Sequence, residues 1–253
     1  MRGVDRAEIS AIAHSWHPVA APVSDDNLRR LVERLELSRG SRVLDLGCGA
    51  GEWLLAALEA APDAEGVGVD SSAPALERAR RSAEVRKLTG RVTFEEADAA
   101  EWEGEGFDAV LCVGATHAFG GLAKALPAAR SHLKPGGRLL LGEGVWEVPP
   151  TPEALAAMQA EPGDLQELAN LITDLRRFGF EPGFGHVSSP AEWDHYEWSW
   201  TGALAGWALE DPGKRGDALE IARTHRQEWL GGYRGQLGFV TLVLHDLGDD
   251  GAL

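Results

Sequence analysis

The chain has 253 residues, of which 44% are hydrophobic and 25% charged, a composition typical of a folded globular protein. Its formal net charge of −16 disfavours nucleic acid as a partner, because Lys and Arg at the phosphates supply much of the affinity for nucleic acids. No apolar run approaches the roughly 20 residues that span a bilayer, and Met1–Trp16 lacks the pattern of a secretory signal. Cys48 and Cys112 have no metal-ligand spacing and are expected to be buried thiols, so we expect a cytoplasmic protein without membrane association.

Strands and helices are expected to alternate through the first half of the chain. A first helix is predicted over Ser24–Leu37, where leucines recur at helical spacing. The strands expected after it are Arg42–Leu46, Gly66–Val69, Arg91–Glu95, Phe107–Val113 and Arg138–Leu141. The helices expected between them are Glu52–Ala61, Pro74–Lys87 and Leu122–Leu133, the last ended by the turn-forming string Lys134-Pro135-Gly136-Gly137. This alternation predicts an α/β fold with a doubly wound, mostly parallel sheet.

The second half of the chain is less regular. A helix is predicted over Asp164–Phe178, a strand over Phe184–Ser188 and a final strand over Phe239–Leu244. Between these strands five of the nine tryptophans fall in a helical stretch at about residues 190–235, with Trp193, Tyr196, Trp200, Leu204 and Trp207 on one helix face. We interpret residues 1–253 as one domain, with an N-terminal arm at 1–23 and a Trp-rich helical cap inserted over the ligand-binding edge before the last strand. His225 is expected to pack beside Trp229.

A glycine-rich turn connects the first predicted strand to the helix that follows. The sequence Asp45-Leu46-Gly47-Cys48-Gly49-Ala50-Gly51 has the spacing Gly-x-Gly-x-Gly, whereas dinucleotide-binding enzymes have Gly-x-Gly-x-x-Gly. Glycines at such a turn let the backbone approach a ligand closely. Asp45 would repel a pyrophosphate but attract an ammonium group, so the turn favours a ligand with an aminoacyl tail.

Two further carboxylates follow the next two predicted strands. Asp70 ends the second strand, where an acid can accept hydrogen bonds from two ribose hydroxyls. Asp98 follows the third strand, where its side chain can accept a hydrogen bond from an exocyclic adenine amine. Together with Asp45 they describe a site for adenine, ribose and a zwitterionic amino acid. Each acid has the alternative role of a helix cap.

The segments Val43–Gly51, Gly68-Val69-Asp70, Phe107–Cys112 and Leu133–Leu139 resemble, in order and spacing, the motifs of class I (Rossmann-like) methyltransferases that depend on S-adenosylmethionine. The resemblance covers about residues 24–143 and is closest to the bacterial small-molecule branch. It implies a seven-stranded sheet whose last strand is antiparallel, S-adenosyl-L-methionine as the cofactor, and methyl transfer to an O, N or C atom of a small molecule. The cofactor-binding residues expected from it are Asp45, Gly47, Cys48, Gly49, Gly51, Asp70, Ser71, Asp98, Ala99 and Val113.

The acceptor is expected to lie near the loop after the fourth strand. His117 in this loop is the candidate general base, because its pKa range suits deprotonation of a hydroxyl or ammonium group. Its alternative roles are to cap the next helix or to bind the cofactor. The substrate-binding candidates are His14, His17, Thr116, Glu143 and Trp146. Glu147, after the fifth strand, is also expected within reach of the substrate. No metal site is expected, because no cluster has metal-ligand spacing.

Two other functions are weighed against methyl transfer. A nicotinamide oxidoreductase is disfavoured because a short-chain dehydrogenase has Lys four residues after its tyrosine. In this chain Tyr196 is followed at that spacing by Trp200, and Tyr233 by Leu237. A non-methylating or regulatory protein that binds S-adenosylmethionine has the same cofactor motifs, and the sequence leaves this alternative open. The oligomeric state and the identity of the acceptor are not predicted.

Overall fold

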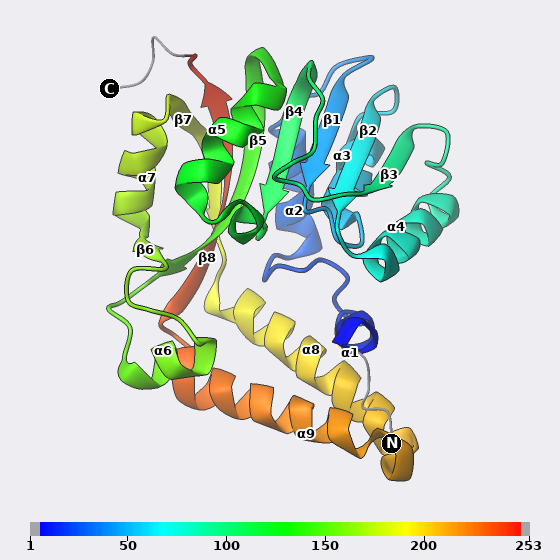
Figure 1. Ribbon diagram of the computed structural model, residues 1–253, viewed down its shortest axis with the longest axis vertical. Coiled ribbons are helices and arrows are strands. Elements are labelled where there is room, and N and C mark those ends of the chain that lie inside the picture. Colours follow the sequence, from blue (N-terminus) through cyan, green and yellow to red (C-terminus); the bar gives the residue numbers. More distant parts are fainter. Residues whose placement is uncertain (1–5, 249–253) are drawn as a thin grey trace. The chain divides into compact units, whose positions relative to one another are not determined.

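The computed structural model describes residues 6–248 and divides the chain into two compact units (Figure 1). We call Ser24–Glu143, Ala169–Val187 and Val240–Leu253 the sheet unit, and Met1–Val23, Gly144–Leu168 and Ser188–Phe239 the helical unit. The helical unit thus combines the predicted N-terminal arm and the predicted cap with a segment from the middle of the chain.

The sheet has the order β3-β2-β1-β4-β5-β8-β7, with β6 paired to β5 outside this path. The strands through β5 pair in parallel, and β8 runs antiparallel to β7, so the predicted mostly parallel sheet is confirmed. The bounds are β1 Arg42–Leu46, β2 Glu65–Asp70, β3 Val92–Glu96, β4 Phe107–Val113, β5 Leu133–Trp146, β6 Gln166–Glu167, β7 Phe180–Val187 and β8 Leu237–Asp246. The sheet has eight strands where seven were predicted, because the two residues of β6 add a short pairing to the end of β5.

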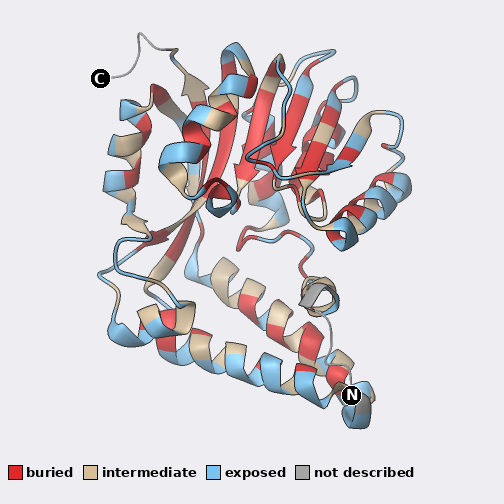
Figure 2. Cartoon of the chain, in the orientation of Figure 1, coloured by how far each residue is buried: buried red, intermediate tan, exposed pale blue. Residues whose placement is uncertain are grey.

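The strands at the centre of the sheet are buried on both faces. Val43, Leu44 and Leu46 of β1 and Ala109–Leu111 of β4 are inaccessible to solvent (Figure 2). This burial explains why both strands consist of nearly continuous apolar residues, which is the pattern of a sheet covered by helices on both sides. The bounds predicted for β1 and β4 agree with the structure.

Five α-helices and one 3₁₀ helix accompany these strands. Their bounds are α2 Asp25–Glu33, α3 Glu52–Ala60, α4 Ala73–Val85, η1 Thr116–Phe119, α5 Leu122–His132 and α7 Leu168–Arg177. In Figure 1, α5 lies in front of the sheet and α3 behind it. α2 ends at Glu33, before the predicted Leu37, since the chain turns at Glu36, which has a φ of 49°.

Three other predicted start points are wrong by four or five residues, because strand pairing extends beyond the local apolar pattern. β5 begins at Leu133, one residue before the string expected to form a turn, and runs through that string, where a register shift opposite Phe107 and Ala109 accommodates the glycines. α7 begins four residues later than predicted, since the residues before it form β6. β7 begins four residues earlier, at Phe180, because it pairs with β8 along its whole length.

The helical unit is built from helices that pack through small residues. Its elements are α1 Arg6–Ala13, α6 Pro152–Met158, α8 Pro190–Glu210, α9 Pro212–Glu228 and the π-helical turn η2 Trp229–Tyr233. α8 begins with a capping box, in which the Ser189 hydroxyl accepts the backbone N–H of Glu192 and the Glu192 carboxylate accepts the backbone N–H of Ser189. Its central contact is a buried cluster of four alanines and Leu204, drawn from α1, α8 and α9, against which Trp200 and Trp207 pack half-buried. Most of the aromatic stripe is therefore a structural seam.

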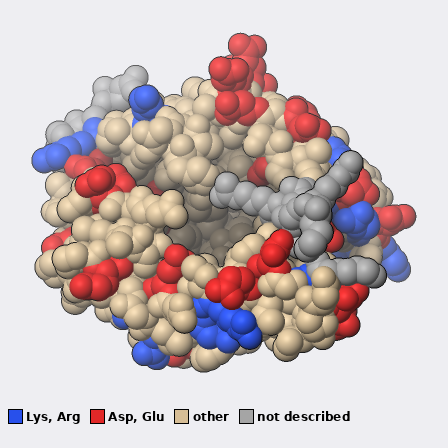
Figure 3. All heavy atoms as spheres, turned by 60° about the horizontal axis from the view of Figure 1, so that its bottom comes forward, with Lys and Arg blue, Asp and Glu red and all other residues tan. Residues whose placement is uncertain are grey.

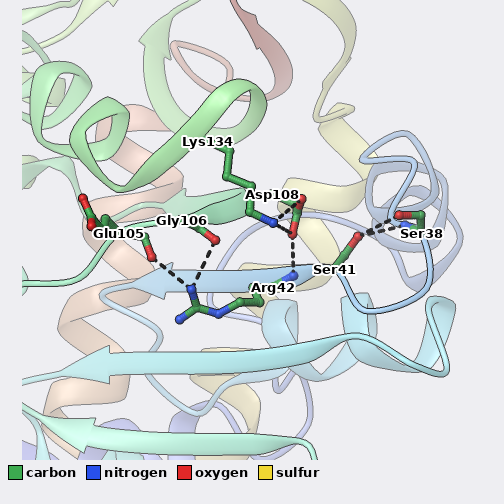
Figure 4. A network of polar contacts seen from close by, with 7 residues as sticks. All are labelled: Ser38, Ser41, Arg42, Glu105, Gly106, Asp108 and Lys134. Atoms are coloured by element: carbon green, nitrogen blue, oxygen red, sulfur yellow. Dashed lines mark hydrogen bonds and ion pairs between the residues drawn. The ribbon is translucent and has the colours of Figure 1, made fainter.

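Asp108 connects the first residues of β4, β1 and β5, at the opposite end of these strands from the glycine turn (Figure 4). Its carboxylate accepts the backbone N–H of Arg42 at 2.8 Å and the ammonium of Lys134 at 2.8 Å. Partial burial raises the pKa of Asp108, but the hydrogen bonds from Lys134 and Arg42 outweigh it and hold the pKa below its ordinary value. A carboxylate with a lowered pKa stabilises the fold above its unfolded-state pKa, and the effect is lost as the pH falls.

We predict that Asp108→Asn lowers the free energy of unfolding by about 1 kcal/mol at pH 7. Urea denaturation should show that the difference shrinks below about pH 4, where the parent carboxyl is protonated as well. Asp63→Asn is the matched control, because the Asp63–Arg39 pair is largely exposed and should contribute little. An equal loss in both variants would contradict this assignment.

Candidate active site

The turn between β1 and α3 requires its glycines. Gly47 and Gly51 both have left-handed backbone angles, with φ of 73° and 76°. A Cβ on Gly47 would lie 2.4 Å from the Cβ of Ala115, and one on Gly51 would lie 2.9 Å from the ring of Phe94. The backbone N–H groups of Gly47 and Cys48 both donate to the carbonyl of Val69 at the end of β2. The turn is thus a fixed concave stretch of backbone.

Asp70 fastens this turn to the start of α4. One of its carboxylate oxygens accepts the backbone N–H of Gly49 at 2.8 Å, and the other accepts the backbone N–H of Ser72 at 2.8 Å. Each oxygen retains a second lone pair for a ligand hydroxyl. Ser72 is the N-cap of α4, whereas the predicted cofactor residue Ser71 is exposed just before it.

Asp45 has the most perturbed carboxyl group of the site. Asp45 is 3% exposed, and its Oδ2 has no partner among the described residues. Burial, and then the nearby charge of Asp70, raises the pKa of Asp45 to about 8. An unpartnered buried carboxylate is costly unless a cation neutralises it. This position therefore fits the ammonium group of an aminoacyl ligand.

The remaining predicted cofactor residues lie at the ends of neighbouring strands. Asp98 is exposed after β3, and one of its oxygens accepts the backbone N–H of Ala100 at 2.9 Å, which leaves the other oxygen for a ligand. Ala99 beside it is buried. Val113 is half-buried at the last position of β4, the strand next to β1.

Two of the predicted substrate residues meet directly. The hydroxyl of Thr116, in η1 after β4, donates to the carboxylate of Glu143 in β5 at 2.7 Å. Thr116 is buried and Glu143 is half-buried. His117, next to Thr116, is exposed, and none of the described hydrogen bonds or ion pairs involves its side chain. The structure therefore brings one predicted carboxylate and one hydroxyl together beside the candidate base.

His14, His17 and Trp146 belong to the helical unit. The ring of His17 is buried, with Nδ1 2.8 Å from the carbonyl of Val19, and it packs edge-on against Tyr196. The ring of His14 also packs on Tyr196. Trp146 is buried, and its Nε1 has no partner among the described residues. Their roles in acceptor binding stay predictions.

The sequence did not indicate a buried polar cluster in the helical unit. Glu197 accepts the hydroxyl of Tyr233 at 2.7 Å and pairs with Nε2 of His225 at 2.8 Å. His225 stacks on Trp200, with ring centroids 4.2 Å apart, and its expected packing beside Trp229 stays a prediction. The available signal was the position of Glu197, one and two turns before Thr201 and Leu204 on the buried face of α8.

Three other features bear on the kind of site: the charge of the surface, clusters of metal ligands and membrane-spanning helices. On the face shown in Figure 3, Lys and Arg are interspersed with Asp and Glu. Among residues 6–248, no group of three or more His, Cys, Asp or Glu side chains is placed to hold a metal ion. Over the same residues, no helix is both long enough and apolar enough to cross a membrane.

Comparison with known proteins places the chain in a family. A model of the methyltransferase domain matches residues 37–198. The uncharacterized protein YjhP of Escherichia coli is 33% identical over 197 residues, which cover 77% of this chain and 79% of that protein. A demethylmenaquinone methyltransferase of Thermus thermophilus is 39% identical over 125 residues, but these cover 49% of this chain and 55% of the enzyme.

Solved structures agree with this placement. An S-adenosylmethionine-dependent methyltransferase from Geobacter sulfurreducens, in complex with S-adenosylhomocysteine, has a TM-score of 0.86 and 28% identity over 96% of this chain and 99% of its own. A second such enzyme, from Thiobacillus denitrificans, has a TM-score of 0.85 and 30% identity over the same shares. The chain therefore belongs to the class I methyltransferases that depend on S-adenosylmethionine, as the sequence motifs predict.

We predict that Asp45→Asn stabilises the protein in the absence of cofactor. The raised pKa means that folding opposes ionisation of this carboxyl, so the parent loses stability as the pH rises from about 4 towards 8. Chemical denaturation of the two proteins should differ little at pH 4 and by roughly 2–4 kcal/mol at pH 8, with the variant more stable. A difference that does not depend on pH would contradict the raised pKa.

Proposed function

We propose that the enzyme transfers a methyl group to an O, N or C atom of a small organic molecule, and that the glycine turn with Asp45, Asp70 and Asp98 holds the cofactor. The buried carboxylate of Asp45 carries this proposal, because its unpartnered Oδ2 lies just before the turn and is suited to an ammonium group. When bound, S-adenosylmethionine supplies an activated methyl group on a sulfonium sulfur.

The other residues provide the complementary contacts for the cofactor. The free lone pairs of Asp70 can accept two ribose hydroxyls, and the free oxygen of Asp98 can accept an amine of the base. Gly47 and Gly51 keep side-chain atoms away from the ligand. Cys48, Gly49, Ser71, Ala99 and Val113 complete the proposed cofactor set.

On the acceptor side, we assign the binding of the substrate to Thr116, His117 and Glu143. Methyl transfer is an in-line displacement that depends chiefly on alignment, so an orienting hydrogen-bond pair such as Thr116–Glu143 is useful in itself. His117 can remove a proton when the acceptor atom carries one. His14, His17 and Trp146 are further candidates for substrate contact.

A small-molecule acceptor is supported by charge and by the relatives. The net charge of −16 opposes a polyanionic substrate. The relative from Thermus thermophilus is named for demethylmenaquinone, a small molecule, and this kind of acceptor is what we propose here. We further propose a cytoplasmic location, since Cys48 and Cys112 are free and buried, as is usual in a reducing compartment.

We predict that changes at the three carboxylates weaken cofactor binding. Asp70→Asn and Asp98→Ala should each reduce the affinity for S-adenosylhomocysteine about 10–100-fold in calorimetric titrations, the usual effect of losing a hydrogen bond to a charged group. Asp45→Asn should also weaken binding, even though it stabilises the free protein. Asp63→Asn, a remote surface control, should leave the affinity unchanged. Unchanged affinity in all three site variants would place the cofactor elsewhere.

We predict that His117→Ala and Glu143→Gln reduce methyl transfer without weakening cofactor binding. S-Adenosylmethionine labelled in its methyl group and a filtrate of cell metabolites should yield a labelled product. With unlabelled S-adenosylmethionine, the same product should be 14 mass units heavier than its precursor, the mass of a CH₂ group. His117→Ala should lower kcat by about 10²–10⁴-fold and remove the acidic limb of the pH profile if it acts as the base. Binding of S-adenosylhomocysteine without any labelled product would instead favour the non-methylating alternative.

A further inference from the structure

A cavity of about 170 Å³ lies wholly within the helical unit. Its walls include Glu147, Ser188, Trp193, Trp229, Tyr233 and Leu237, and none of these residues belongs to the glycine turn or to the acceptor residues assigned above. A cavity of about 150 Å³ is large enough to bind benzene. This cavity therefore has room for one ring with a short substituent.

The cavity carries one uncompensated negative charge. Asp194 and Arg234, which also line it, form a two-fold ion pair with both N–O distances at 2.8 Å, so their charges cancel. Glu147, an exposed residue at the mouth of the cavity, is the remaining charged residue of its lining, and none of the described side-chain interactions involves its carboxylate. This carboxylate lies against the backbone of Gly238, where a Cβ would be 2.6 Å from its Oε1.

Two residues of the wall each have a buried polar atom without a partner. The hydroxyl of Ser188, a residue only 4% exposed, and the Nε1–H of Trp193 make no hydrogen bond among the described residues. A buried polar atom without a partner costs about 1–3 kcal/mol.

A hydrogen-bonded group of side chains fixes the position of Tyr233, one of the aromatic residues of the wall. The Tyr233 hydroxyl donates to Glu197, and Glu197 pairs with His225. Burial and the charge of Glu197 raise the pKa of Tyr233, so its phenol stays neutral and keeps its hydrogen bond. The rings of Tyr233 and Trp193 pack with their centroids 6.4 Å apart. Such rings attract organic cations through their faces.

We propose that this cavity is a binding site for a small one-ring amine in its protonated form, with the ammonium group paired to Glu147 and the ring packed among Trp193, Trp229 and Tyr233. The site is separate from the residues proposed to hold the cofactor. Its ligand therefore binds without S-adenosylmethionine, and failure of this inference would leave the proposed methyl transfer untouched.

The test compares protonated phenethylamine with 2-phenylethanol, its neutral analogue of similar size. Calorimetric titration of the full chain at pH 7, without cofactor, should show the amine binding at least tenfold more tightly than the alcohol. Glu147→Gln should abolish this preference and leave the affinity for the alcohol unchanged. Gly238→Ala should weaken amine binding as well, because its Cβ displaces the carboxylate.

Glu161→Gln is the matched control, since Glu161 is an exposed carboxylate of the same unit and its substitution changes the net charge equally. This variant should keep the preference of the parent, which separates a local ion pair from the general attraction of an acidic protein. Thermal unfolding of each variant checks that it is folded. The inference is overturned if the parent binds neither compound, if it binds both equally, or if Glu147→Gln keeps the preference.

Discussion

The active site depends on a constraint at the end of β1, where the chain must reverse direction in a few residues and still expose its backbone to a ligand. Left-handed glycines make that reversal, and Ala115 and Phe94 occupy the space in which side chains would otherwise lie. Asp45, just before this turn, is buried, and its burial raises its pKa. The site proposed at this turn thus combines a fixed backbone shape with a buried carboxylate.

Much of this arrangement could be predicted from the sequence, because it is encoded locally. β1 and β4 are apolar runs long enough to identify a strand buried on both faces, and the glycine spacing fixes the turn between β1 and α3. The ends of β5, β7 and α7 could not be predicted in this way. They depend on strand pairing: β5 pairs with β4 and β6, and β7 pairs with β8. This pairing overrides local turn signals such as Pro135-Gly136.

In the candidate site too, single residues could be predicted from the sequence, whereas contacts between residues far apart in the sequence could not. Asp45, Asp70 and Asp98 lie at or after strand ends and could be predicted individually, but the hydrogen bond between Thr116 and Glu143 joins η1 to β5 across 27 residues of sequence. Likewise, the pairing of Glu197 with His225 and Tyr233 connects α8 to α9 and η2, and no periodicity in the sequence specifies it. Residue types near the strand ends could be predicted, whereas their partners depend on the packing of side chains.

Hydrogen-bond partners distinguish a buried carboxylate that supports the fold from one that is suited to bind a ligand. Asp45 and Glu197 are both almost fully buried, so both would be costly as isolated charges. Glu197 offsets this cost with a tyrosine hydroxyl and a histidine of its own unit, and it needs nothing from outside the protein. Asp45 has one oxygen without a hydrogen-bond partner, and a buried polar atom of this kind is suited to bind a ligand that donates a hydrogen bond to it. Burial alone would have given both residues the same role, and only the count of hydrogen-bond partners separates them.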